Sequence, residues 1–278
     1  MANEVITKPK TQVTFSGFMT SDGIKKKINE IIGNKERGSR FISSIVSAVS
    51  TNPQLGQCDN ASILSGALLG ESLNLSPSPQ LGRYYLLPFK DKSRGMVAQF
   101  ILGYKGYLEL AQRSGQYKDI NVIEVKEGEY KGRNQLTGNP TFEFIVDDDV
   151  RDTKETIGYM ASFTLINGFT KTIYMTKKQM EEHALQYSSG YRADKKNKTA
   201  YTFWTKDFDG MAFKTLLRQL ISKWGIMSID MQNAYEGDMA VINEDGSKNY
   251  VDNVPDAEFE VVEQPSEENR EVKSLDEV

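Results

Sequence analysis

The chain has one cysteine and one histidine among its 278 residues, which excludes internal disulfides and structural zinc sites of the Cys/His type. A single thiol, Cys58, cannot form an internal disulfide, and His183 alone cannot complete a zinc site of the Cys/His type. No apolar run approaches the roughly 18 residues of a membrane-spanning helix, and the N-terminal MANEVITKPK is too polar for a signal-peptide core. These absences predict a soluble cytoplasmic protein without a membrane partner.

The charges of the chain are divided unevenly along its length. Residues 231–278 hold 14 acidic and 3 basic residues, a net charge of −11. Residues 1–230 hold 31 basic and 24 acidic residues, a net charge of +7, although the whole chain carries −4. A basic body indicates a polyanionic partner, and the acidic end needs a separate explanation.

Helical periodicity dominates the N-terminal part of the chain after a start without pattern. Residues 1–20 are predicted to be mobile. Residues 21–76 are predicted to form a helical unit, with Ser21 capping its first helix and Ser39 its second. We expect this unit to supply contacts between subunits, because its short helices are apolar on one face.

Extended segments follow in residues 77–232. Segments rich in β-branched and aromatic residues occur at 83–89, 97–104, 120–125, 141–146, 157–166 and 171–175. Asn167-Gly168 between the last two indicates a β-hairpin. Helices are expected at about 177–187 and 209–224. Strands grouped between helices predict an α+β fold with antiparallel sheet and hairpins.

The acidic end, residues 233–278, has few large apolar residues and is predicted to be a disordered tail. Its charge opposes that of the body, so a tethered tail can compete weakly for the polyanion site. A solubility device and a docking site for another protein are the alternatives. The sequence leaves all three roles open.

The segment YSSGYRADKKNKTAYTFWTK, residues 187–206, mixes cations with flat side chains. It contains five cations and five aromatic residues, and Asp194 is its one acid. Single-stranded nucleic acid requires this combination, because cations follow the backbone and rings stack on unpaired bases. The candidate contacts are Tyr191, Arg192, Lys195, Lys196, Lys198, Phe203, Trp204 and Lys206. The alternative is a mobile lysine-rich loop beside a short aromatic strand.

The predicted helix DGMAFKTLLRQLISKWG, residues 209–225, has no acid after its first residue. Its apolar stripe, which includes Trp224, is expected to face the core, and Lys214 and Arg218 lie four residues apart on another face. Lys223 suits the C-terminal end of the helix dipole. Lys214 and Arg218 have no partner within the helix and are therefore candidate phosphate contacts.

The stretch FILGYKGYLELAQRSGQY, residues 100–117, joins a predicted strand to a predicted helix. Tyr104 and Tyr107 fall on the apolar stripe of that helix, so we expect them to brace the junction. Lys105 falls on a polar face, and Lys105 and Arg113 are expected to meet phosphate.

The sequence contains few residues that would support an enzymatic function. GNKERGSR, residues 33–40, imitates a phosphate-binding loop, but Ser39 occupies the lysine position and no strand precedes it, so ATP hydrolysis is not expected. Glu124 and Lys126 share one face of a strand, as in metal-dependent nucleases, and Asp147–Asp149 are candidate magnesium ligands. Such a nuclease is the main rival function, although a solvated turn also explains the aspartates.

Two blocks of sequence carry a resemblance. The first runs from LGRYYLLPF (81–89) through QFILGYKGYLELAQRSGQYKDINVIEVKEGE (99–129), and the second is FWTKDFDGMAFKTLLRQLISKWGIMS (203–228). Both resemble the RecT family of phage-type single-strand annealing proteins, over about residues 55–232. The resemblance implies a β-β-β-α core and an ATP-independent recombinase, not an enzyme, that coats single-stranded DNA and pairs it with its complement. A passive coat that does not speed pairing is a further rival.

The resemblance also implies partners and site residues. It implies single-stranded DNA and an annealed duplex intermediate, a homo-oligomer in the form of a filament or ring, a phage exonuclease and a host single-strand binding protein in the bacterial cytoplasm. It implies no cofactor and no metal. The residues carried over within the matched blocks are Tyr104, Lys105, Tyr107, Arg113, Lys118, Phe203, Trp204, Lys206, Lys214, Arg218 and Lys223.

Overall fold

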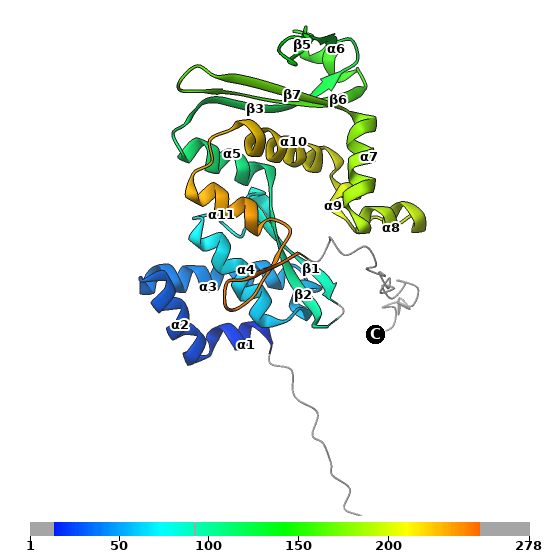
Figure 1. Ribbon diagram of the computed structural model, residues 1–278. Helices are drawn as coiled ribbons and strands as arrows, with labels where there is room; N and C mark the ends of the chain where they lie inside the picture. The colour runs from blue at the N-terminus through cyan, green and yellow to red at the C-terminus, as the bar shows by residue number, and fades with distance from the viewer. Residues whose placement is uncertain (1–13, 92, 251–278) are drawn as a thin grey trace, which may run out of the picture.

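A three-stranded antiparallel sheet with one long helix across its face forms one end of the molecule (Figure 1). The computed structural model describes residues 14–91 and 93–250. The strands lie in the order β3-β6-β7, and α10 packs against all three. Their bounds are Tyr117–Lys126 (β3), Thr156–Leu165 (β6), Thr170–Thr176 (β7) and Phe208–Trp224 (α10). The predicted α+β class with a β-β-β-α core is confirmed.

Alternation of side chains along the strands gives the sheet two apolar faces. Tyr159 of β6 faces α10, where its ring centroid lies 5.9 Å from that of Phe213. Met160 and Tyr174 pair across β6 and β7 and face the other way. The turn between these strands is the predicted hairpin, and Gly168 adopts a φ of +87°, which an Asn-Gly turn needs.

An insertion between β3 and β6 covers the face of the sheet away from α10 (Figure 1). It consists of β4 (Tyr130–Arg133), β5 (Pro140–Phe142) and α6 (Asp148–Asp152). The ring of Tyr130 stacks on that of Tyr174 at 4.6 Å, and Phe142 packs on the same ring at 5.7 Å. Asp147 caps α6 by accepting the Val150 amide at 3.2 Å, so the acidic run begins a short helix instead of forming a plain turn.

Helices α1 to α4 and a β-hairpin make up the opposite end of the molecule (Figure 1). Their bounds are Phe15–Thr20 (α1), Asp22–Ile32 (α2), Lys35–Ser50 (α3), Asn60–Ser72 (α4), Tyr84–Asp91 (β1) and Gly95–Leu102 (β2), with 3-10 turns at Leu55–Gln57 and Pro79–Leu81. Residues 15–20 are helical and bury Phe15 and Met19, where the sequence predicted a mobile start. Asn34, not Ser39, caps the second helix of the predicted unit.

The chain returns to this hairpin after α10. Helix α11 spans Ile229–Gly237, and the short strands β8 (Val241–Ile242) and β9 (Lys248–Asn249) pair with each other. The amide of Phe100 in β2 donates to the carbonyl oxygen of Ala240 at 2.8 Å. The disorder predicted for residues 233–278 is therefore wrong for residues 233–250, and residues 251–278 lie outside the described part of the chain.

The remaining elements of the described fold are helix α5 and three consecutive helices. α5 (Tyr104–Arg113) begins at the end of β2, as its periodicity predicted. We call α7 (Lys177–Tyr187), α8 (Ser189–Asn197) and α9 (Phe203–Lys206) the arm. The lysine-rich segment is thus helical and is neither a loop nor a strand, because Ser188 caps α8. No helix in the described ranges is long and apolar enough to cross a membrane.

Candidate nucleic-acid interface

Three aromatic rings from separate elements meet at a notch between β1, α5 and α9. The ring centroids of Tyr85 and Phe203 lie 5.0 Å apart, and Tyr104, the first residue of α5, lines the same notch. All three side chains are partly buried, so packing holds the rings while part of each stays accessible. We call Tyr85, Tyr104 and Phe203 the aromatic notch.

Two exposed lysines flank the aromatic notch, and neither forms an ion pair with a described residue. The Lys105 Nζ lies 5.9 Å from the ring centroid of the preceding tyrosine. A Cβ at Gly82 would lie 3.1 Å from the Tyr85 hydroxyl and 3.4 Å from Lys105 Cδ, so the glycine lets these side chains converge. Lys206 follows Phe203 by three residues in α9 and lies on the same side of that helix.

One acid, Asp207, lines the aromatic notch. Its carboxylate is engaged as the N-cap of α10, where it accepts the Gly210 amide at 3.0 Å. Burial and the nearby Asp207 charge raise the pKa of Tyr85, so its hydroxyl stays protonated and can donate a hydrogen bond. Bases suit the rings of the notch, whereas phosphates suit its lysine rim.

Two predicted phosphate contacts form an ion cluster around the buried Asp238, and one of them, Lys214, also lines the notch. Lys214 Nζ lies 2.7 Å from Asp238 Oδ1, and Arg218 Nη1 lies 2.7 Å from Asp238 Oδ2. The Tyr107 hydroxyl donates to Asp238 at 3.2 Å, and Lys214, Tyr107 and Asp238 are all buried. Lys214 and Arg218 have no ion-pair partner within α10, as the sequence indicated, but Asp238 pairs with both from the segment that was taken for a disordered tail. Tyr107 braces the strand-to-helix junction, as its periodicity predicted.

Two predicted stacking rings of the arm are also buried. Tyr191 is 3% exposed and Trp204 is 6% exposed. The Trp204 ring packs 5.4 Å from Phe208 and 6.1 Å from Tyr191. These rings hold the arm against α10, and only Phe203 of the three predicted arm aromatics reaches the aromatic notch.

Asp194 organises the arm from inside. Its Oδ1 accepts the Thr199 hydroxyl at 2.7 Å, and its Oδ2 accepts both the amide and the hydroxyl of Thr202 at 2.8 Å and the Thr205 hydroxyl at 2.8 Å. Burial disfavours the charged carboxylate, but the hydrogen bonds outweigh it and lower the pKa of Asp194 below its ordinary value. Since its partners are hydroxyls and amides, Asp194 forms no ion pair with the lysines that surround it in the sequence.

The other predicted cations of the arm are exposed. Lys195 pairs with Glu181 at 2.8 Å, and Arg192 donates to two carbonyl oxygens at the end of α7, at 2.8 and 3.0 Å. Lys196 and Lys198 form no ion pair with a described residue. The arm therefore adds free positive charge beside α9.

Three further predicted contacts are exposed but lie apart from the aromatic notch. Arg113 donates to the Leu73 carbonyl oxygen at 2.5 Å. Lys118 lies near the start of β3, and Lys223 lies near the end of α10. None of their contacts with described residues connects them to the notch.

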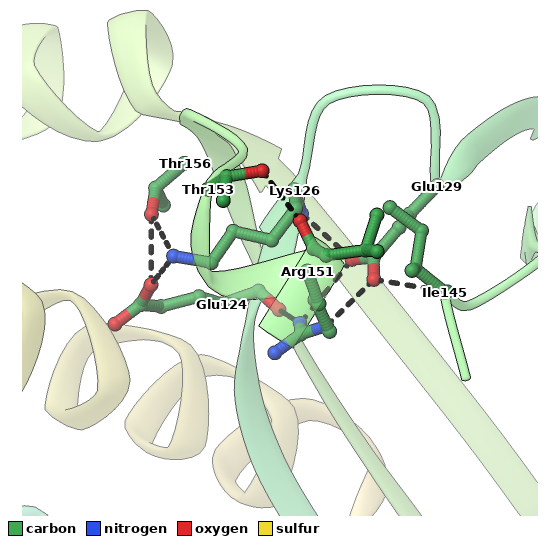
Figure 2. Close-up of polar contacts among 8 residues, drawn as sticks. Glu124, Lys126, Glu129, Ile145, Arg151, Thr153 and Thr156 are labelled. Carbon is green, nitrogen blue, oxygen red and sulfur yellow. Dashed lines mark hydrogen bonds and ion pairs between the residues drawn. The ribbon is translucent and has the colours of Figure 1, made fainter. Parts of the chain in front are cut away.

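The residues of the rival nuclease form a network that fastens the insertion to the sheet (Figure 2). Lys126 Nζ donates to Glu124 Oε2 at 2.6 Å and to the Thr156 hydroxyl at 2.8 Å. Arg151 Nε donates to Glu129 Oε1 at 2.6 Å, and the Glu129 side chain is fully buried. Burial tends to raise the pKa of Glu124, but hydrogen bonds from Lys126 and Thr156 lower it below its ordinary value.

The aspartates of that rival do not join Glu124 in a metal site. Asp147 is engaged as a helix cap, and Asp148 and Asp149 are exposed in the first turn of α6. The described ranges contain no group of three or more His, Cys, Asp or Glu residues that could hold a metal ion. The carboxylates of Glu124 and Glu129 are thus paired with Lys126 and Arg151 and stabilise the attachment of the insertion to the sheet (Figure 2).

Residues 39–252 match the model of the RecT family. The chain belongs to the RecT family. It is 38% identical over 239 residues to the uncharacterized protein YqaK of Bacillus subtilis (strain 168), covering 86% of this chain and 75% of YqaK. It is 29% identical over 231 residues to Protein RecT of Escherichia coli (strain K12), covering 80% of this chain and 78% of that protein.

RecT-family membership supports single-strand annealing in recombination and binding of single-stranded DNA. It confirms the family that the two motif blocks indicated. The RecT match also runs past residue 232, where the motif resemblance ended, to residue 252. This agrees with the buried Asp238, which makes residues 233–250 part of the folded body.

Two residues of the interface region, Tyr85 and Asp238, were not predicted from the sequence. Tyr85 lay within a quoted motif, and the alternation of Tyr84 and Tyr85 in a strand predicts that one faces the core and the other does not. Tyr84 is indeed 1% exposed, and Tyr85 lines the notch. Asp238 had no comparable signal, because it is one acid in a strongly acidic stretch.

Proposed function

We propose that this chain binds single-stranded DNA at the aromatic notch and its lysine rim and anneals it to a complementary strand without ATP. The observation that supports this is the gathering of three partly accessible rings, from β1, α5 and α9, between the unpaired Lys105 and Lys206. Base–aromatic stacking contributes about 1–3 kcal/mol per base and tolerates any sequence. Neutralised phosphates add affinity that depends on salt.

Annealing by such a site needs no chemical fuel. Each stacked base-pair step formed is worth about 1.4 kcal/mol, so pairing drives itself once the strands are held open. The segment that imitated a phosphate loop, residues 33–40, spans the end of α2 and the start of α3 and follows no strand. This supports a binding protein that is not an enzyme.

The proposed assembly is a homo-oligomer along DNA in the bacterial cytoplasm. A phage exonuclease that produces single strands and a host single-strand binding protein are the partners that its RecT-family membership suggests. The exposed cations Lys196 and Lys198 of the arm extend the proposed DNA path beyond the notch.

The test is a double charge reversal, Lys105→Glu with Lys206→Glu. If each lysine meets one phosphate, the slope of log affinity against log salt should become shallower by about 0.7 per contact. Binding is measured by fluorescence anisotropy with labelled oligonucleotides at several salt concentrations, and annealing by quenching between complementary strands. Arg133→Glu, at another exposed cation away from the notch, is the matched control and should leave the slope unchanged.

The same assays separate the rival functions. A folded double variant with an unchanged salt slope would place the DNA elsewhere on the molecule. Wild-type protein that binds strands without speeding their pairing would be a passive coat. Strands shortened in magnesium but intact in EDTA would indicate the nuclease.

A further inference from the structure

Eight of the fifteen large hydrophobic side chains exposed in the described ranges belong to two surfaces. The first, which we call the acidic knob, contains Phe144, Val146 and Val150 together with the aspartates 147–149 of the insertion. Val146 is 95% exposed and Val150 is 46% exposed. Phe144 stacks on Phe142 with ring centroids 5.5 Å apart, but most of the Val146 side chain lies in solvent within the acidic run.

The second surface, which we call the hairpin-tip patch, lies where the β6–β7 turn meets the connection from α10 to α11. Its members are Ile166, Phe169, Trp224, Ile226 and Ile229, with exposures of 41% to 76%. The Tyr117 hydroxyl donates to the Ile226 carbonyl oxygen at 2.9 Å, which ties that connection to β3. Lys171 Nζ lies 4.6 Å from the Trp224 ring centroid and ties it to β7. Trp224, expected to be in the core, is therefore part of an exposed apolar surface.

The two surfaces lie at opposite ends of one strand. β6 begins at Thr156, four residues after α6, and ends at Leu165, immediately before Ile166. A strand of ten residues is about 33 Å long. Figure 1 shows the insertion toward one end of the sheet and the β6–β7 turn at the other. A surface at one end can therefore meet the other surface only on a different molecule.

Charge also differs between the two ends. Residues 143–155, around the acidic knob, hold six acids and two basic residues, one of which is the internally paired Arg151. The exposed Lys118 and Lys223 and the partly exposed Lys171 lie at the hairpin-tip end, together with the acids Asp119 and Asp230. Apolar contact would therefore supply most of the attraction, and the lysines would favour the acidic knob over a second hairpin tip.

We infer that the acidic knob of one copy docks on the hairpin-tip patch of a second copy. The contact joins unlike surfaces, so it leaves one free knob and one free patch and can repeat along a line. This inference rests on the DNA-bound assembly proposed above and names its interface. The N-terminal helical unit, residues 21–76, is less suited, because Ile31 is its one exposed large hydrophobic side chain and Ile28 is fully buried.

Hydrogen bonds to the buried Glu129 fix the conformation of the acidic knob. Arg151 of α6 donates to both carboxylate oxygens of the buried Glu129, at 2.6 and 3.2 Å, and to the Glu124 carbonyl oxygen at 2.7 Å (Figure 2). The Ile145 amide donates to the same glutamate at 3.3 Å. A surface fixed before binding loses less conformational entropy when it docks.

The contact is small, so DNA is needed to align the copies. Stable interfaces bury about 1,200–2,000 Å² in total, and three side chains against five fall short of a typical one. Copies bound side by side on one strand meet at high effective concentration, which raises their joint affinity by about 10²-fold or more. Assembly should therefore appear on long oligonucleotides and be weak on short ones.

The test uses two single variants, Val146→Asp on the knob and Ile229→Asp on the patch. Both sites are more than 70% exposed, so the fold should tolerate the change. Mass photometry on a long oligonucleotide should show single bound copies for each variant alone and pairs, but no longer chains, for their mixture. Apparent affinity for long strands should fall about 10-fold or more as avidity is lost. Binding to an oligonucleotide that holds one copy should stay within about two-fold of wild type, since the notch is untouched.

Ile31→Asp is the matched control and should keep long assemblies. Long assemblies formed by either Val146→Asp or Ile229→Asp alone, or loss of assembly with Ile31→Asp only, would overturn the inference. Failure of the wild-type protein to bind the short oligonucleotide would instead overturn the proposed function, so the two outcomes are distinguishable.

Discussion

Two buried aspartates, Asp194 in the arm and Asp238 after α11, use the same carboxylate in different ways. Asp238 pairs with two cations, the buried Lys214 and the partly exposed Arg218. Asp194 is surrounded by lysines in sequence but accepts from amides and hydroxyls. The first carboxylate pairs with cations that have no partner within their own helix, and the second forms no ion pair with the cations around it in the sequence. Counting charges along a segment therefore does not show which cations can meet DNA.

The largest expected effect concerns the ion cluster. Asp238→Asn leaves Lys214 buried beside a neutral amide, and removing one partner of a buried ion pair costs about 3–5 kcal/mol. The free energy of unfolding, measured by urea titration and circular dichroism, should fall by about that much. Asp230→Asn, on the exposed start of α11, is the control and should change it little. A loss below about 1 kcal/mol would mean that water or another group compensates Lys214.

Two neighbouring aromatic residues of the arm, Phe203 and Trp204, are expected to differ in their roles in binding and stability. Trp204→Ala removes a buried ring that packs on Phe208 and should cost about 3 kcal/mol of unfolding free energy. Phe203→Ala, one residue earlier, should cost less stability but weaken single-strand binding by about 1–3 kcal/mol through lost stacking. Urea titration and anisotropy on the same samples measure both quantities. Equal binding losses in correctly folded samples of both variants would contradict the assignment of Phe203 alone to the notch.

The contribution of Asp194 to the free energy of unfolding should depend on pH. Its folded-state pKa is lower than the ordinary value, so its ionised form stabilises the fold. That stability is fully present above about pH 4 and is lost as the pH falls through the lower folded-state value. Asp194→Asn should cost about 2–3 kcal/mol at pH 7, because the lost hydrogen bonds involve a charged acceptor. The difference between variant and wild type should shrink toward pH 3, and Glu182→Gln, exposed on α7, should show no such trend. A difference that stays constant from pH 7 to about pH 3 would exclude this role.

The smallest effect is expected from the acidic residues after Tyr250. Truncation after Tyr250 removes ten acidic and two basic residues without touching Asp238. If this segment competes for the DNA site, low-salt affinity should tighten by less than about 1 kcal/mol, because each solvated contact is weak. The gain should vanish above about 0.2 M salt as screening shortens the range of the charges. Unchanged low-salt affinity would leave partner docking or solubility as its role. Truncation at Tyr235 cannot serve, since it removes Asp238.

Much of the fold was readable from sequence because its signals are local. Five of the six predicted strands, the Asn167-Gly168 turn and the helix at Lys177–Tyr187 lie within a few residues of where their patterns place them. The strand predicted at 141–146 is wrong beyond Phe142, because β5 spans only Pro140–Phe142. Family membership was readable for a similar reason, since the two motif blocks are continuous in the chain. Boundaries set by distant contacts were not readable, as at Phe15 and Met19 of α1, which are buried by the rest of the core.

The sequence by itself determined the α+β class, the RecT family and the types of side chain suited to single-stranded DNA. Only the tertiary structure decided which of those side chains are available. Lys206 and Lys214 are eight residues apart in one basic block, yet Lys206 is exposed beside the notch and Lys214 is buried against Asp238. The physical reason is that ion pairing and burial depend on distance in space, and the Asp238 carboxylate is brought to Lys214 across 24 residues by the turn from α10 into α11.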